Sequence, residues 1–193
     1  MEDIARLKDE ELVFHYIENE DQSAFSELVN RYLKPAYNFS LRLCGNPKDA
    51  EEISQESFVK LWKNLGKFRQ GEKFKTWFYT IIRNTTIDWM RKKKSILFSE
   101  FDNEEGNNYL EDTLIDTEKT AHELFEISEY KTTVEKLLGE LTVQYREVLL
   151  LRYHEGLDFD EIGKTLKKSI NTVKSQHRRA LIVLREKMKN APK

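Results

Sequence analysis

The sequence predicts an all-α protein of two small helical domains joined by an acidic linker. Glycine and proline are scarce, with seven and three residues, which is typical of helices with short connections. Apolar residues recur at helical spacing through most of the chain, and charged residues make up 34% of it. The charge also falls into blocks: residues 31–94 carry 15 basic and 6 acidic side chains, residues 95–130 carry 1 and 11, and residues 131–193 carry 14 and 8. Two basic blocks separated by an acidic one favour a polyanionic partner for each domain.

The first domain, residues 1–95, is expected to hold four helices. The first spans about residues 8–20, and the second begins after Asp21 and is kinked or broken at Pro35, because proline removes a helical hydrogen bond. A turn at residues 45–47 leads into the third helix, which ends at Gly66. The fourth helix runs from about residue 72 to residue 94. The apolar side of the third helix is expected to consist of Phe58, Leu61, Trp62 and Leu65.

Two of these helices carry polar rows beside their apolar sides. The third helix has an acidic face, which by itself indicates a solvated surface with stabilising pairs such as Glu56–Lys60. The fourth helix combines cations, an amide and an aromatic ring along one side, as in proteins on which single-stranded bases stack and phosphates pair. For its tryptophan, a plain core position is the alternative. The row consists of Lys73, Trp77, Thr80, Asn84, Asp88 and Arg91.

Residues 96–128 are predicted to form an acidic, mobile linker with a short helix near its end. The second domain, residues 129–193, then begins with a helix to about residue 138 and a helix that Thr142 caps and Gly156 ends. Asp158 with Glu161 forms the start of a short helix, and Ser169 caps the next one. We interpret this pair as a helix-turn-helix, whose second helix reads base edges in the major groove; an ordinary helical hairpin with a solvated face is the alternative. The outer face of that second helix is formed by Thr172, Lys174, Ser175, Gln176, Arg178 and Arg179, and its apolar face by Ile170, Val173, His177, Ala180, Leu181, Leu184 and Met188.

Several classes of protein are disfavoured. The single cysteine, Cys44, forms no internal disulfide and fits a reducing cytoplasm. The acidic start lacks the features of a signal peptide, and no apolar run reaches transmembrane length, so we expect a cytoplasmic protein without membrane insertion. The four histidines are scattered, and neither a phosphate loop nor metal-ligand spacing occurs. We therefore expect no catalytic residues, no metal site and no cofactor.

Three stretches together resemble bacterial RNA polymerase sigma factors of the extracytoplasmic-function type. They are DAEEISQESFVKLW at residues 49–62, FKTWFYTIIRNTTIDWMRKKK at residues 74–94, and the C-terminal stretch at residues 141–181. The resemblance covers roughly residues 21–187, including the domain order and the acidic linker. It implies a factor that binds core RNA polymerase and directs initiation at promoters. Such a factor reads the distal (−35) promoter element as duplex and the proximal (−10) element as a melted single strand. The resemblance further implies an anti-sigma protein as regulator, and we expect a monomer when the protein is free.

The resemblance also assigns residues to these partners. The outer face of the helix-turn-helix would read the distal element. Gln176 stands where the family commonly has Arg, so the promoter sequence does not carry over; Gly163 stands where Ala is common, at a cost of about 1 kcal/mol in a helix. The core-polymerase dock would consist of Asp49, Glu52, Gln55, Glu56 and Val59. The proximal element would be held by Phe68, Arg69, Lys73, Trp77, Thr80, Asn84, Asp88 and Arg91.

A stand-alone helix-turn-helix regulator is the second interpretation. It would bind duplex DNA without polymerase, and usually as a dimer. The acidic helix at residues 49–62 and the row on the fourth helix have no role in such a protein.

Overall fold

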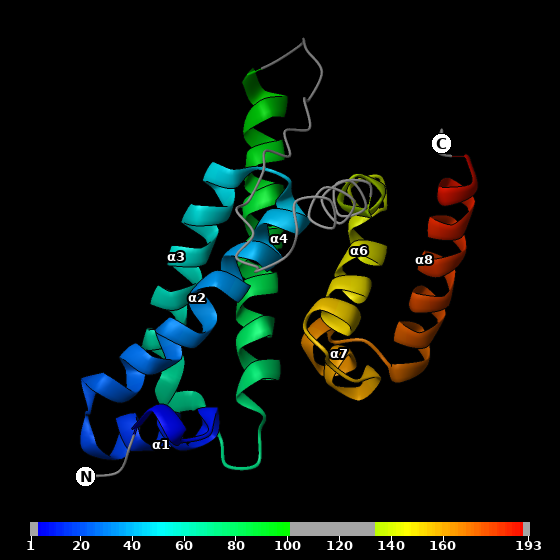
Figure 1. Ribbon diagram of the computed structural model, residues 1–193. Helices are drawn as coiled ribbons and strands as arrows, with labels where there is room; N and C mark the ends of the chain where they lie inside the picture. The colour runs from blue at the N-terminus through cyan, green and yellow to red at the C-terminus, as the bar shows by residue number, and fades with distance from the viewer. Residues whose placement is uncertain (1–3, 101–133, 191–193) are drawn as a thin grey trace, which may run out of the picture.

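The computed structural model describes residues 4–100 and 134–190, and every regular element in these ranges is a helix or helical turn, which confirms the predicted class (Figure 1). The N-terminal part comprises η1 (Ile4–Arg6), α1 (Asp9–Asn19), α2 (Gln22–Cys44), α3 (Pro47–Asn64), η2 (Leu65–Lys67) and α4 (Phe74–Glu100). The C-terminal part comprises a helical segment at residues 134–139, α6 (Val143–Leu149), the π-helical turn η3 (Leu150–His154), α7 (Phe159–Leu166) and α8 (Ile170–Asn190). No helix in the described ranges is both long enough and apolar enough to cross a bilayer.

Local capping fixes the ends of α2 and α3. The carboxylate of Asp21 accepts a hydrogen bond from the backbone N–H of Ser23, and α2 ends at Gly45, whose φ of 76° lies in the left-handed region that glycine adopts without strain. Asn46 then caps α3 through the backbone N–H of Asp49. Of the two outcomes predicted at Pro35, the break is wrong, because α2 is continuous through it, and the kink stays a prediction. Burial of the side of α2 that faces the core offsets the hydrogen bond that proline removes.

Helix α4 is longer than predicted. It begins at Phe74, two residues later than expected, and continues to Glu100, six residues past the expected end. No glycine or proline occurs between Gly71 and Gly106, so nothing in the sequence stops the helix at residue 94. Its last residues therefore fall in the stretch assigned to the linker. Residues 101–133, which include the rest of that linker and the start of the helix expected near residue 128, lie outside the described residues.

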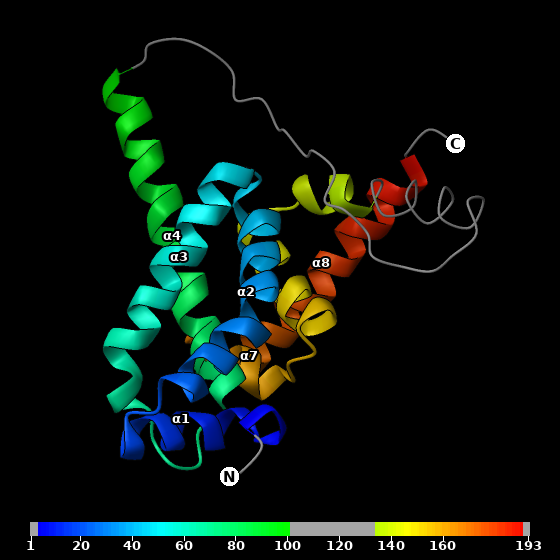
Figure 2. The ribbon, with the colours of Figure 1, turned by 60° about the vertical axis from the view of Figure 1, so that its left-hand side comes forward.

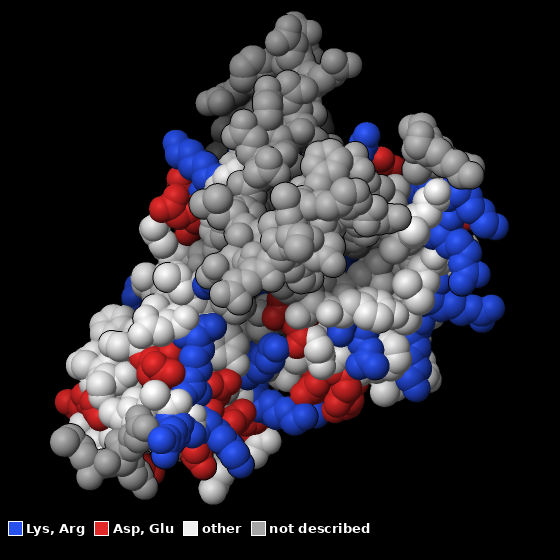
Figure 3. All heavy atoms as spheres, in the orientation of Figure 1, with Lys and Arg blue, Asp and Glu red and all other residues white. Residues whose placement is uncertain are grey.

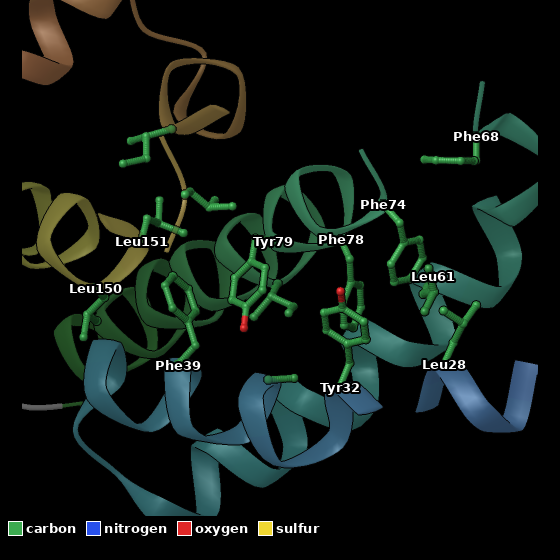
Figure 4. Packing of buried hydrophobic residues seen from close by; sticks show 14 of the residues in the cluster. Leu28, Tyr32, Phe39, Leu61, Phe68, Phe74, Phe78, Tyr79, Leu150 and Leu151 are labelled. Carbon is green, nitrogen blue, oxygen red and sulfur yellow. The ribbon is translucent and has the colours of Figure 1, made fainter. Parts of the chain in front are cut away.

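Aromatic rings from α2 and α4 fill the N-terminal core (Figure 4). The ring of Tyr32 meets those of Phe74 and Phe78 edge-on, with centroids 5.2 Å and 5.5 Å away, and Phe39 meets Tyr79 edge-on at 5.3 Å. Pairs in this geometry contribute about 0.5–1.5 kcal/mol each beyond the area that they bury. This cluster fixes the orientation of α4 about its own axis, and so fixes which of its sides faces outward.

The capping box predicted for α7 is present. The carboxylate of Asp158 accepts from the backbone N–H of Glu161 at 2.8 Å, and the Glu161 carboxylate accepts from the N–H of Asp158 at 2.7 Å. At the other end of α7 the N–H of Lys168 donates to the carbonyl of Gly163 at 2.9 Å, and a Cβ at position 163 would lie 2.9 Å from the Lys168 carbonyl oxygen. A side chain at position 163 would therefore require the tight turn to shift. Ser169 caps α8 by accepting from the N–H of Thr172, as predicted.

The two predicted domains pack against each other and share one hydrophobic core. The buried cluster extends from Phe39 and Tyr79 to Leu150, Leu151 and Ile162 of the C-terminal part without interruption (Figure 4). Two views place α7 beside the N-terminal half of α4 (Figures 1 and 2). A second, smaller cluster lies between α6 and α8. The arrangement of the chain is thus closed, with α4 between the N-terminal helices and the helix-turn-helix.

Candidate polymerase and promoter surfaces

The acidic face of α3 lies mainly at the surface. Glu52 and Gln55 are exposed, Val59 is 48% exposed, and the Glu56 carboxylate pairs with the Lys60 ammonium at 2.8 Å, as predicted. These side chains follow one another along the outer side of the helix. Together they form a surface that is acidic and contains one apolar side chain.

Asp49 differs from the other residues predicted for this face. Its carboxylate is 16% exposed and accepts a hydrogen bond from the Lys93 ammonium at 2.6 Å. The pair ties the start of α3 to the basic end of α4. Asp49 therefore holds two helices together in this arrangement, whereas Glu52, Gln55 and Glu56 remain available to a partner.

Trp62 belongs to the exposed side of α3, and its predicted place in the apolar core is wrong. The side chain is 53% exposed, while its neighbour Leu61 is fully buried. The indole N–H donates to the Tyr16 hydroxyl at 2.9 Å, which fixes the ring at the surface one turn after Val59. In the sequence, the i, i+3 spacing of Trp62 from Val59 is the feature that predicts the same exposed side of the helix for both residues. Val59 and Trp62 give the acidic face of α3 an apolar centre.

The loop before α4 rests on aromatic rings that meet at tilted and edge-on angles. Phe68 is 5% exposed, and its ring lies 5.4 Å from that of Trp77 and 5.8 Å from that of Phe14. Arg69, in contrast, is exposed, and its backbone N–H donates to the Glu72 carboxylate at 3.0 Å. Of the two loop residues predicted to touch DNA, the structure buries Phe68 beneath the loop and leaves Arg69 on its surface.

The polar row on α4 is present, but its members differ in their contacts. Lys73 is exposed and its ammonium lies 2.7 Å from the Glu161 carboxylate, and this hydrogen bond raises the pKa of the lysine, which keeps it charged. Trp77 is half-buried. The Thr80 hydroxyl donates to the carbonyl of Thr76, and Asn84 accepts from Arg83. The first residue of the row, Lys73, therefore contacts α7 through Glu161.

The far end of the row lies away from the C-terminal part. Arg91 is exposed, and its guanidinium pairs with the half-buried Asp88 at 3.1 Å. Lys92 is exposed beside it. This end of α4 therefore presents exposed cations, which suit a polyanion.

The outer face of α8 is basic and exposed. Lys and Arg side chains gather along the right-hand edge of the molecule, over this helix (Figure 3). Gln176 is the exception among the predicted readers, because it is half-buried and accepts a hydrogen bond from the Lys168 ammonium at 3.2 Å. The Thr172 hydroxyl is paired with that of Ser169. The exposed members of the predicted set are Thr172, Lys174, Ser175, Arg178 and Arg179.

The inner face of α8 is only partly the predicted apolar face. Val173 and Ala180 are fully buried, whereas Ile170, Leu181 and Met188 are 41%, 37% and 58% exposed. Among the later positions Leu184 packs against the cluster of Leu141, Leu149 and Ala180, whereas Leu181 and Met188 remain partly open to solvent. The predicted apolar face is therefore buried at its centre and partly exposed at its ends.

His177 occupies the edge of this inner face. Its ring lies between those of Tyr153 and Phe159, with centroids 5.5 Å and 5.2 Å away, and its Nε2 lies 2.9 Å from the Tyr153 hydroxyl. Burial, and next the charge of Arg152, lowers the pKa of this histidine. The neutral side chain serves to pack the helix-turn-helix.

Comparison with known proteins identifies both halves of the chain. The family model for sigma-70 region 2 matches residues 28–96, and that for sigma-70 region 4 matches residues 131–184. The extracytoplasmic-function sigma factor SigW of Bacillus subtilis is 33% identical over 172 residues, which cover 88% of this chain and 91% of that protein. The sigma-H factor of Pseudomonas aeruginosa is 28% identical over 183 residues, 92% of each chain.

Solved structures share the fold. The sigma factor RpoE of Bartonella quintana, solved with the anti-sigma factor NepR, has a TM-score of 0.70 at 22% identity and covers 86% of this chain and 96% of its own. CnrH, solved with the cytosolic domain of CnrY, has a TM-score of 0.67 at 23% identity and covers 95% and 99%. The chain belongs to the extracytoplasmic-function sigma factors, and its function is to direct RNA polymerase to promoters for transcription initiation.

Proposed function

We propose that this sigma factor divides its task among three surfaces. Residues 1–95 act as sigma region 2, in which α3 docks on core RNA polymerase and α4 holds the melted proximal element. Residues 129–193 act as sigma region 4, in which α8 reads the distal element as duplex. The matches to regions 2 and 4 at residues 28–96 and 131–184 support this division.

The observation that carries the docking proposal is that exposed Glu52, Gln55 and Val59 lie with half-buried Glu56 on one side of α3, inside the region-2 match. We add Trp62 to this surface, because an exposed ring beside an exposed aliphatic side chain is the kind of anchor that dominates binding energy in protein interfaces. The acidic residues around it would steer a basic partner surface. Asp49 supports the dock by holding α3 against α4 through Lys93.

Charge reversal at Glu52 and Glu56 tests the dock. The variant Glu52→Lys/Glu56→Lys should lose co-migration with core RNA polymerase on gel filtration, while its circular dichroism stays that of the parent. Glu18→Lys/Glu20→Lys is the matched control, because both residues are exposed acids at the end of α1 that change the net charge equally. Equal retention of polymerase by both variants would remove this face of α3 from the dock.

For the proximal element we propose that Arg69, Lys73, Trp77, Thr80, Asn84, Asp88 and Arg91 line the path of the non-template strand. Phe68 belongs to this site as the ring that supports the loop from below, since it is buried. Stacking of a base on an aromatic ring contributes about 1–3 kcal/mol. Lys73 would pair with a phosphate of the same strand. Lys73→Ala in the assembled holoenzyme should therefore slow promoter opening without changing core binding, as permanganate footprinting of unpaired thymines would measure.

For the distal element we propose the exposed face of α8, with Thr172, Lys174, Ser175, Arg178 and Arg179 toward the groove. The side-chain oxygen of Gln176 joins this set only if its hydrogen bond to Lys168 is exchanged for one to a base. Each good bidentate contact to a base contributes about 1–3 kcal/mol of discrimination. The stand-alone regulator is not favoured, since it gives the region-2 half no role.

Four further attributes are proposed with this function. The protein acts in the cytoplasm, is a monomer when free, and has no active site or cofactor of its own, because the polymerase makes the phosphodiester bonds. An anti-sigma protein is proposed as its regulator, which the solved complexes of RpoE with NepR and of CnrH with CnrY support by their shared fold. Sedimentation of the free protein and co-purification from its own cells would test these attributes.

A further inference from the structure

Three polar side chains link the interior of the C-terminal part to helix α8. Glu147 of α6 is fully buried, and its carboxylate accepts from the Lys168 ammonium at 3.1 Å. The same ammonium donates to the side-chain oxygen Oε1 of Gln176 at 3.2 Å. All three residues belong to the C-terminal part, so the link lies within the helix-turn-helix and the helix that packs beneath it.

Lys168 is held in place at both of its ends. Its backbone N–H donates to the carbonyl of Gly163 at 2.9 Å, in a turn so tight that a Cβ on this glycine would lie 2.9 Å from the Lys168 carbonyl oxygen. Its ammonium is bound by the Glu147 carboxylate, which also accepts from the Arg83 guanidinium at 2.9 Å. Because a buried carboxylate is destabilising without cationic partners, Glu147 keeps the ammonium directed toward the interior.

The chemistry of lysine decides which end of the Gln176 amide faces it. An ammonium has three donors and no acceptor, so only the amide oxygen can lie against it. The amide nitrogen, which carries two N–H donors, is therefore directed away from Lys168. The contact fixes the orientation of the amide as well as its position.

Gln176 occupies the edge of the proposed reading face. Helix geometry places it four residues after Thr172 and three before Arg179, both exposed, so the three side chains lie in one row. On its other side Val173 and Ala180 are fully buried, and Gln176 itself is half-buried. The oxygen end of the amide thus faces the interior, and the nitrogen end lies beside the exposed row.

We propose that Glu147 and Lys168 are positioning residues for the reading of the distal promoter element. They make Gln176 a donor of hydrogen bonds only, which selects guanine at its base pair. The inference rests on the proposed role of α8 and adds the base that one position of this helix prefers. A glutamine that rotates freely selects adenine instead, because it donates to N7 and accepts from the N6 amino group.

The preference for guanine follows from the groups that each base presents in the major groove. Guanine presents two acceptors, N7 and O6, and thymine presents one, whereas adenine and cytosine each present an amino group. An amide N–H that meets an amino group has no acceptor there, and a donor without an acceptor weakens binding. With its oxygen bound to Lys168, Gln176 cannot turn to accept from such an amino group.

The test uses the full chain assembled with core RNA polymerase and a library of promoters in which the distal element is randomised. Sequencing of the bound promoters gives the base preference at each pair. Gln176→Ala identifies the pair that this side chain reads, because the preference there is lost. At that pair the parent should prefer guanine over adenine by about fivefold or more.

Lys168→Met separates the orientation of the amide from its presence. The variant frees the oxygen of Gln176, so the preference at this pair should change from guanine to adenine by about fivefold or more, while the other pairs keep theirs. Lys168→Arg keeps donors toward both Glu147 and Gln176 and should retain guanine. The matched control is Lys167→Met, an exposed neighbour with the same change in charge, which should leave every preference unchanged. A purely structural role of Lys168 would instead lower promoter binding without changing the preferred base.

The contrary results are distinct. Adenine as the base that the parent prefers at the pair read by Gln176 would overturn the proposal, and this result decides the matter even if Lys168→Met does not fold. Guanine retained by a folded Lys168→Met would also overturn it, as would equal preferences of Gln176→Ala and the parent at every pair. A parent without preference at any pair would overturn the proposed role of α8 itself, and the inference with it.

Discussion

Arg146 is expected to be the most stabilising single cation of the C-terminal part. Its guanidinium donates to the carbonyls of Arg42 and Leu43 at 3.3 Å and 3.1 Å, to that of Leu141 at 3.1 Å, and to that of Gly139. Burial lowers its pKa, and its Nε has no partner. A positive charge thus lies at the C-terminal end of α2, where unpaired carbonyls and the helix dipole favour it.

Replacement of Arg146 by Met should lower the free energy of unfolding by about 3–5 kcal/mol. Four hydrogen bonds from a charged donor, at about 1.5–3 kcal/mol each, set an upper bound of about 6–12 kcal/mol. The net loss is smaller, because the carbonyls at the end of α2 rehydrate and the desolvation of the guanidinium is relieved. At about 2–4 °C per kcal/mol for a chain of this size, the melting temperature should fall by about 6–20 °C.

Urea unfolding followed by circular dichroism measures this loss, with Arg146→Lys and Arg185→Met as companions. Lysine keeps the charge but lacks the planar fork, so its loss should be intermediate. Arg185 is exposed on α8, and its replacement should change stability by less than about 0.5 kcal/mol. A loss within about 1 kcal/mol for Arg146→Met would refute the reasoning, since four buried hydrogen bonds would then contribute almost nothing.

Three other outcomes are expected. Arg179→Ala should lower the discrimination of the holoenzyme between intact and scrambled distal elements by about 1–3 kcal/mol, measured by competition binding, while core binding is unchanged. Gly163→Ala, which in most helices stabilises by about 1 kcal/mol, should here destabilise by a similar amount in thermal melts, because its Cβ would lie 2.9 Å from the Lys168 carbonyl oxygen. Burial, and then the charge of Arg152, lowers the pKa of His177 in the folded protein, so the unfolded chain binds a proton at this histidine at a higher pH than the folded protein does. Stability measured by urea unfolding should therefore decrease as the pH falls below 6.5, the usual pKa of histidine.

Each of these expectations has its own contrary result. Equal discrimination by the parent and Arg179→Ala would take that side chain off the reading face, and Arg185→Ala on the same helix is the control. A higher melting temperature for Gly163→Ala would mean that the turn adjusts at no cost. For His177, a His177→Gln variant should lose part of the pH dependence, and an unchanged profile would assign it to other groups.

The local features of the fold were predictable because they depend on residues close together in the sequence. The capping box of Asp158 and Glu161, the cap at Ser169 and the pair Glu56–Lys60 each join residues three or four positions apart. Their energetics depend on helix geometry alone, so they can be read before any tertiary structure is known. The family motifs added the order of the two halves and their partners.

The features that the sequence does not predict depend instead on residues that are distant in the sequence. The apolar character of Trp62 predicts a core position, but the position of α2 and α4 around α3 decides which side of α3 is covered. The same holds for α2, whose packing carries it through Pro35, and the burial of Phe68 likewise depends on rings distant in sequence. Helix periodicity gives the faces of a helix, while the neighbours decide how much of each face water reaches.

The sequence by itself determined the helices, their caps, the two basic blocks and membership of the sigma factor family. Only the tertiary structure decided that the two halves close on each other, with Arg83 bound to Glu147 across 64 positions and Thr165 beside Thr76 across 89. In the sequence Glu147, Glu155 and Glu161 are ordinary acidic residues of a charged domain, for which solvent is the expected surrounding. They become buried partners of α4 because apolar surfaces of both halves meet around them, and a contact of that kind depends on shape in three dimensions rather than on spacing along the chain.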